Sequence, residues 1–144
     1  MRDIRWLALV GVLGLLLAGC GGGDGDNGSE LSEEAEAACT ASELSEAPNL
    51  PAGWPDMGEV TFTQQSTQGP TEVVEGYFEG DIQAAHDDFT RELEAAGFTI
   101  LFDEVEENDS EVSWKGEGRS GQVAIRNECG EDDKMYVKVT NRPL

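Results

Sequence analysis

Side chains suited to catalysis are scarce in this 144-residue chain, which holds one histidine and three cysteines. His86 lies between Ile82 and Phe89 at the margin of an apolar helical face and is followed by Asp87 and Asp88. A His–Asp pair supports nucleophilic catalysis only beside a nucleophile that it activates. The sequence contains no GxSxG, SxxK, HExxH or phosphate-loop motif. We therefore predict that the protein is not an enzyme and that His86 is a partly buried structural histidine or an exposed one.

Carboxylates are abundant, with 30 acidic against nine basic residues and a formal charge of −21. Nucleic acid binding needs basic patches, so this charge excludes a nucleic acid partner. Asp24, Asp26 and the acidic run at 103–109 are candidate calcium ligands. The two aspartates lack the later ligands of an EF-hand loop, and the acidic run is typical of a solvated turn. We expect no metal site and no cofactor, with a carboxylate-based calcium binder or a hydrolase as the alternative.

The N-terminus has the pattern of a targeting segment. Arg2 and Arg5 supply a short positive region, and residues 6–19 form an uncharged apolar run of 14 residues. A helix that crosses a bilayer needs roughly 20 such residues, so this run is too short. Its length and flanks are typical of the apolar part of a signal peptide.

The apolar run ends in Leu17-Ala18-Gly19-Cys20, which resembles the lipobox of bacterial lipoproteins. The resemblance implies cleavage before Cys20 and a diacylglyceryl group, carrying palmitate-type chains, on its sulfur. Two acyl chains are enough for stable anchoring. It therefore implies a protein bound through Cys20 to the cell membrane or outer membrane, on the extracytoplasmic side. Gly21 stands where an aspartate would imply retention at the inner membrane.

Two cysteines remain once Cys20 is assigned to lipid. Cys39 and Cys129 are an even pair in an oxidising compartment, where a disulfide is the default. A redox site is the alternative, but the spacing is not CxxC and the flanking residues supply no cation that would stabilise a thiolate. We predict a disulfide that ties the acidic segment around Cys39 to the edge of a sheet.

Composition divides the chain into three parts. Residues 1–19 are the signal peptide, residues 20–48 are the lipidated cysteine with a flexible acidic tether, and residues 49–144 are a single domain. The tether opens with a glycine-rich run and continues with acidic residues from Glu30 to Glu46. In that acidic part we expect at most a short, weak helix capped by Ser29 or Ser32. A stiff, apolar lead-in then begins the domain, Leu50-Pro51-Ala52-Gly53-Trp54-Pro55.

The domain shows strand and helix periodicities in a simple order. Alternation of apolar and polar residues predicts six strands, Val60–Thr63, Val74–Glu79, Phe98–Phe102, Val112–Lys115, Val123–Arg126 and Met135–Val139. Helical spacing predicts one helix that begins at Gly80 or Asp81 and stops at Gly97. The turns between strands are short, which favours antiparallel pairing. We predict an α+β fold, an antiparallel sheet of about six strands with one helix packed on one face, in the order ββαββββ.

The face of the sheet opposite this helix is a candidate binding surface. The alternation places two tyrosines and three basic residues there, Tyr77, Lys115, Arg126, Tyr136 and Lys138. An aromatic and basic face on an acidic domain is a candidate site for a partner. The alternative is cross-strand pairing of these cations with glutamates of the same parity, Glu75, Glu111, Glu117 and Glu128.

The region from Leu50 to Pro143 resembles small extracytoplasmic domains in lipoproteins of actinobacteria and other bacteria. The resemblance rests on the lead-in, the helix end Leu93-Glu94-Ala95-Ala96-Gly97-Phe98 and the strands after it. These domains have no assigned activity, so the resemblance implies fold and location only. We interpret the chain as a membrane-anchored lipoprotein with a small non-catalytic binding or interaction module for an envelope protein or a small ligand. A purely structural surface protein is the remaining alternative.

Overall fold

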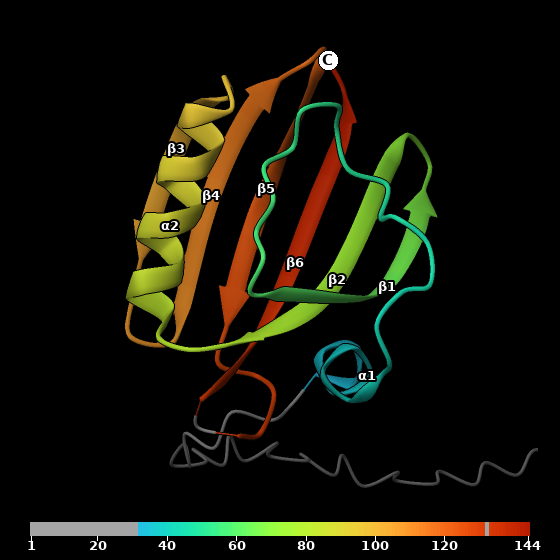
Figure 1. Cartoon of the computed structure of the whole chain (residues 1–144), viewed down its shortest axis with the longest axis vertical. Coiled ribbons are helices and arrows are strands. Elements are labelled where there is room, and N and C mark those ends of the chain that lie inside the picture. The colour runs from blue at the N-terminus through green and yellow to red at the C-terminus, as the bar shows by residue number, and fades with distance from the viewer. Residues whose placement is uncertain (1–31, 132) are drawn as a thin grey trace, which may run out of the picture.

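A single antiparallel sheet organises the structure, a computed structural model that describes residues 32–131 and 133–144 (Figure 1). The sheet has six strands in the order β1-β2-β6-β5-β4-β3. The strands are β1 (Val60–Gln68), β2 (Thr71–Glu79), β3 (Thr99–Val105), β4 (Asp109–Gly116), β5 (Arg119–Arg126) and β6 (Lys134–Pro143), and the helices are α1 (Glu33–Thr40) and α2 (Ile82–Ala95). The α+β fold and the order ββαββββ from β1 onward are confirmed.

The helix α2 packs across β3, β4 and β5 on one face of the sheet and lies in front of the sheet in Figure 1. Asp81 caps its first turn, where the side chain accepts a hydrogen bond from the Ala84 amide at 2.9 Å. Gly97 follows its last turn with a φ of 91°, which glycine adopts without strain. The inner face of α2 and the facing strands form the main core, which includes Phe89, Leu93, Val112, Trp114, Val123, Ile125, Val137 and Val139.

The connection from α1 to β1 covers the part of this face that α2 leaves open. Residues 41–59 cross in front of β5, β6 and β2 in Figure 1 before they enter β1. Leu50, Trp54 and Met57 of this connection pack against the main core. The Trp54 ring lies 5.0 Å from Trp114 and 5.6 Å from Phe98, edge to face in both pairs. The apolar lead-in is therefore part of the core covering.

The opposite face of the sheet is partly covered by α1. Ser32 caps this helix by accepting a hydrogen bond from the Ala35 amide at 3.1 Å. Ala35, Ala38 and Cys39 are buried against Tyr136 in a second, smaller cluster. The predicted disulfide joins Cys39 to Cys129 with the two Cα atoms 5.6 Å apart, although Cys129 lies between the central strands β5 and β6 and not at an edge strand.

The position of α1 corrects the expected extent of the tether. We expected a spacer up to residue 48, but α1 and the chain that follows it pack on both faces of the sheet, so the folded unit includes residues 33–48. Propensity alone gives a weak helix here. Burial of its alanines and the crosslink to Cys129 hold it in place. The glycine-rich start of the tether and the lipobox lie outside the described residues.

Gly121 on β5 allows a close approach that a side chain would prevent. A Cβ atom here would collide with the Thr140 carbonyl oxygen and would lie 2.8 Å from Cζ2 of the buried Trp114. We expect Gly121→Ala to lower the free energy of unfolding by about 1–3 kcal/mol, the usual cost of overpacking. Urea unfolding followed by tryptophan fluorescence measures this change. Gly58→Ala is the control, because no atom lies within 4 Å of its Cβ, and equal losses in both variants would contradict the packing argument.

Candidate functional site

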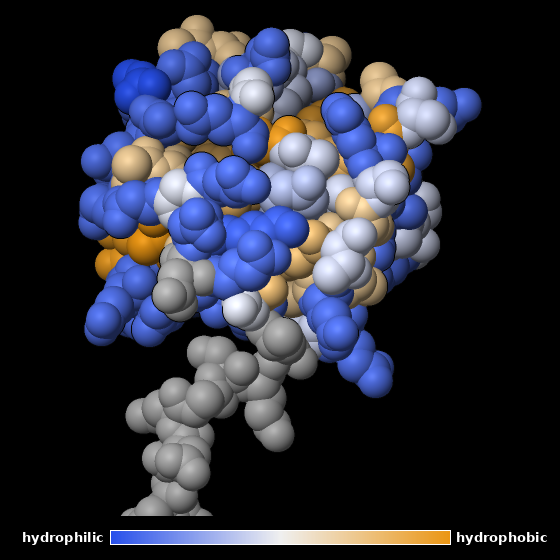
Figure 2. All heavy atoms as spheres, turned by 60° about the horizontal axis from the view of Figure 1, so that its bottom comes forward, coloured by the Kyte–Doolittle hydropathy of each residue, from blue (hydrophilic) through white to orange (hydrophobic). Residues whose placement is uncertain are grey.

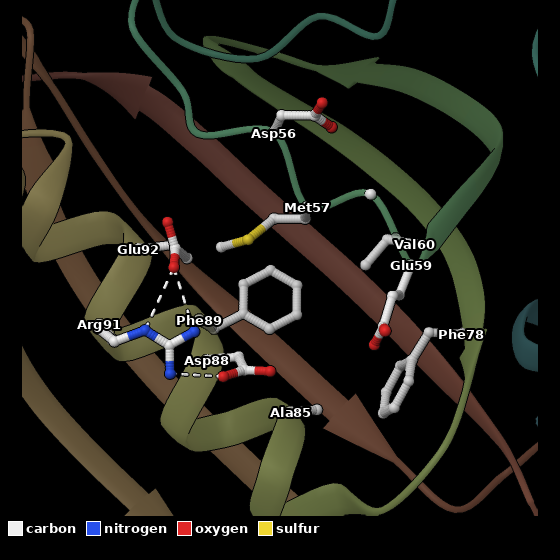
Figure 3. Close-up of a pocket in the computed structure, with 11 residues that line it drawn as sticks. Asp56, Met57, Glu59, Val60, Phe78, Ala85, Asp88, Phe89, Arg91 and Glu92 are labelled. Carbon is white, nitrogen blue, oxygen red and sulfur yellow. Dashed lines mark hydrogen bonds and ion pairs between the residues drawn. The ribbon is translucent and has the colours of Figure 1, made fainter.

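A groove opens where α2 meets the chain just before β1. Its volume is about 290 Å³, and it is lined by residues 56–60, by β2 and by α2. Figure 3 shows the rings of Phe78 and Phe89 and the side chain of Met57 around it, with Val60 and Ala85 completing the apolar lining. The groove exists because two separate pieces of chain cover this face of the sheet and do not meet. Small-molecule sites are commonly concave and mainly apolar, with a few polar groups at the edge.

Charged groups at the rim give the groove a negative character. The only cation in the lining is Arg91, which lies 2.6 Å from Asp88 and 3.1 Å from Glu92. Within the described residues, Asp56 and Glu59 have no cationic partner. Figure 3 shows the Glu59 carboxylate directed toward Phe78 and the Asp56 carboxylate directed away from the groove. The groove therefore combines apolar walls with one free carboxylate directed toward an aromatic ring.

Four residues of the predicted aromatic and basic face are brought together, all except Lys115, but α1 covers their centre. Tyr136, Tyr77 and Arg126 lie side by side across β6, β2 and β5. Tyr136 is 1% exposed, since it lies beneath α1, and its hydroxyl donates a hydrogen bond to the Glu75 carboxylate. Tyr77 is half-buried, with Lys134 Nζ 4.1 Å from its ring centroid. Tyr136 is therefore a buried contact of α1, and the ring of Tyr77 is partly covered and contacts Lys134.

The three cations of this face differ in their surroundings. Lys138 Nζ lies 2.7 Å from Glu34 and 3.7 Å from Glu75. Arg126 lies 3.3 Å from Asp109 and 3.8 Å from Glu111. The pairing that we considered as the alternative is thus present for Lys138 with Glu75 and for Arg126 with Glu111. Lys115 is exposed at the other end of the sheet and has no carboxylate partner among the described residues.

Burial and hydrogen bonds shift the ionisation of the groups beneath α1. Burial raises the pKa of Glu75, whereas the hydrogen bond from Lys138 lowers the pKa of Glu34. Burial, together with the nearby Glu75 carboxylate, raises the pKa of Tyr136. At neutral pH the phenol therefore stays protonated and can donate to Glu75. The cluster holds α1 against the sheet, and its tyrosine is covered by this helix.

These opposite shifts predict opposite pH dependence for two substitutions. The raised pKa of Glu75 means that its ionised form costs stability, and the cost disappears as pH falls through its folded-state pKa. We therefore expect Glu75→Gln to raise the free energy of unfolding above that of the native chain most strongly near pH 7. This gain should shrink as the pH falls. Glu34 has a lowered pKa, so its stabilisation is full above its unfolded-state pKa and is lost as pH falls through its folded-state pKa. We expect Glu34→Gln to cost up to about 1 kcal/mol near pH 7 and less as pH falls toward 4.

The measurement is urea unfolding of the three proteins between pH 7 and pH 4. Comparing each variant with the native chain at the same pH cancels the shared titration of the other carboxylates. Parallel pH profiles for the two variants would contradict the assigned environments.

His86 lies in a buried polar contact between α2 and the β3–β4 hairpin. Its Nδ1 atom is 2.9 Å from Ser110 Oγ and its Nε2 atom is 3.5 Å from Asp103. These are the residue types of a hydrolytic triad, but Ser110 is only 1% exposed, which is low for a nucleophile. Asp103 is the exposed member. The arrangement fits the structural alternative for His86, which ties the helix to the hairpin.

The acidic hairpin end does not form a compact set of ligands. Glu104, Glu106, Asp109 and Glu111 surround a shallow hollow of about 170 Å³ together with Ser110. Within residues 32–131 and 133–144, no group of three or more His, Cys, Asp and Glu side chains is arranged to hold a metal ion. Asp24 and Asp26 lie outside the described residues.

The groove is the feature that sequence patterns missed. Met57 and Glu59 precede a strand and Arg91 lies on the outer side of a helix, so no local motif connects them. The only available signal was the apolar lead-in, because its apolar residues were expected to pack on the domain. That signal indicates a covering segment but not the place where it would stop short of α2.

Comparison with families of proteins, with curated proteins and with solved structures finds no match to this chain. In the described part of the chain, neither helix is long and apolar enough to cross a membrane. The end of the domain where α1 lies is mainly hydrophilic, with apolar residues in small separate patches (Figure 2). The geometry of the groove and of the sheet surface that α1 leaves exposed is therefore the basis for functional inference.

Proposed function

We propose that the chain is a lipid-anchored extracytoplasmic lipoprotein whose domain is a non-catalytic binding module, with the groove as its site. The observation that carries the binding role is the apolar groove beside α2, with Glu59 at its rim and no cationic partner for Glu59 among residues 32–131 and 133–144. Apolar walls select an apolar body, and the carboxylate beside Phe78 selects a positive head group. The ligand class is thus a small organic cation with an ammonium group on an apolar body.

Two observations support the location. The disulfide between Cys39 and Cys129 is typical of proteins that fold outside the cytosol. The lipobox-like Leu17-Ala18-Gly19-Cys20 follows a run with the length and flanks of a signal peptide. The glycine-rich sequence after Cys20 is proposed as the spacer between the lipid anchor and the domain.

Anchoring depends on the sulfur of Cys20. We expect the native chain, expressed in a bacterium with a lipoprotein pathway, to enter the detergent phase on Triton X-114 partition and to incorporate an alkyne-labelled palmitate. Cys20→Ser removes the acceptor, so the protein should move to the aqueous phase without label. Cys129→Ser serves as the control, since it changes a cysteine without touching the anchor. Aqueous partition of the native chain would contradict the proposal.

Ligand selectivity follows from the free carboxylate in the groove. Titration of the labelled domain with n-hexylammonium should give saturable amide NMR shifts at residues 56–60 and 85–92. Hexanol, with the same tail and no charge, should bind more weakly, and hexanoate more weakly still. Glu59→Gln should weaken hexylammonium binding about two- to fivefold, the value of an exposed ion pair.

Glu94→Gln is the matched control, because Glu94 is an exposed carboxylate on α2 that does not line the groove. Its affinity for hexylammonium should equal that of the native domain. Binding of hexanoate as strong as that of hexylammonium, or shifts spread over the whole surface, would overturn the assignment.

A further inference from the structure

One end of the sheet face that carries α1 is uncovered. Ser113, Gln122 and Thr140 lie side by side across β4, β5 and β6, and Lys115, Ser120 and Arg142 form the next row. We name these six residues the distal face. They alternate with core residues such as Trp114 and Val123, so their side chains point away from α2. A trough of about 410 Å³ is lined by five of them, all except Lys115.

The charge of the distal face is unlike that of the rest of the domain. Of the basic residues in the described part of the chain, four pair with carboxylates, Arg91, Arg126, Lys134 and Lys138. Lys115, Arg119 and Arg142 have no carboxylate partner among the described residues. Arg119 donates a hydrogen bond to Asn141 instead, whereas Lys115 and Arg142 belong to the distal face. No carboxylate lines the trough, although the chain contains 30. Two cations without carboxylate partners make the distal face a candidate site for anionic groups.

The polar groups of the distal face are available for a ligand. Within the described residues, the hydroxyls of Ser113, Ser120 and Thr140 form no side-chain hydrogen bond. Each hydroxyl can donate one hydrogen bond and accept others. Gln122 uses its amide nitrogen on Glu111 at 3.0 Å, which leaves its carbonyl oxygen free. A flat row of such groups matches a ligand that itself presents many hydroxyls.

Apolar contact is available at one edge of the trough. Leu101, which is 56% exposed, lines the trough, and Phe102, which is 50% exposed, is the neighbour of the lining residue Ser113 across β3 and β4. The register shift between Ile100 and Phe102 disrupts edge pairing, so β3 is a poor template for adding a peptide strand. An exposed ring beside hydroxyls and cations instead provides a surface for the carbon face of a sugar ring.

We propose that the distal face binds an anionic saccharide chain. Ser113, Ser120, Thr140 and Gln122 would bond its hydroxyls, Phe102 would contact its ring carbons, and Lys115 and Arg142 would pair with its carboxylate or phosphate groups. In Figure 1 the C-terminus, which follows Arg142, lies at the end of the sheet opposite α1. A tether attached at α1 therefore leaves the distal face directed outward. The site is separate from the groove and independent of its ligand.

The test uses a galacturonate hexamer as the probe, with amide NMR titration of the domain. Saturable shifts at the distal face that weaken as salt is raised are expected, and the fully methyl-esterified hexamer should bind at least several-fold more weakly. Lys115→Gln and Arg142→Gln should each lower affinity about two- to fivefold. Arg91→Gln changes the net charge equally but lies on the other face, so its affinity should be unchanged.

Three results would overturn the proposal. The first is an absence of saturable shifts at the distal face, and the second is an equal loss of affinity in Arg91→Gln. The third is equal or tighter binding of hexaglutamate at the same residues, which would identify an acidic peptide surface in place of a saccharide site. Hexylammonium shifts at residues 56–60 report on the groove, so failure of either site is recognised separately.

Discussion

The structure depends on one constraint, namely that a six-stranded sheet is wider than the single long helix that packs on it. Six strands span about 24 Å, whereas a helix with its side chains is about 10 Å wide. The helix α2 therefore covers only the β3–β5 side. The remaining apolar surface is buried by residues 41–59, with Trp54 packed on Trp114. The groove follows from this division, because it is the seam between two coverings that belong to different parts of the chain.

The sheet and α2 could be predicted because their signals are local. Alternation in segments such as Val123–Arg126 and the spacing of Ile82, Phe89 and Leu93 each identify one element and its buried face. The disulfide followed from counting cysteines once Cys20 was assigned to lipid. The role of α1 could not be predicted in the same way. Its buried residues are mainly alanines, which give little apolar signal. The stability that they contribute depends on contact with Tyr136, about 100 positions away in the sequence.

The candidate site was only partly accessible to sequence reasoning for the same reason. Parity placed Tyr136 and Lys138 on the face opposite α2, where they lie. Parity says nothing of a distant segment that folds over that face, so it could not separate Tyr136, which is buried beneath α1, from Lys115, which is exposed. Ion pairing cannot be predicted from parity either. Most cations in the described part of the chain pair with nearby carboxylates, and the cations that lack such a partner can be identified only from the positions of the side chains.

The disulfide between Cys39 and Cys129 also decides how the domain bears mechanical load. Tension applied from the N-terminal side reaches Cys39 at the end of α1 and passes through the covalent bond to Cys129, just before β6. The strands β1 to β5 and the helix α2 all lie inside the loop that this bond closes. Pulling therefore cannot peel β1 from the sheet edge and unravel the strands in sequence. The strand β6 lies outside the loop, so a load between the N-terminal side and the C-terminus falls on the hydrogen bonds that join β6 to β2 and β5.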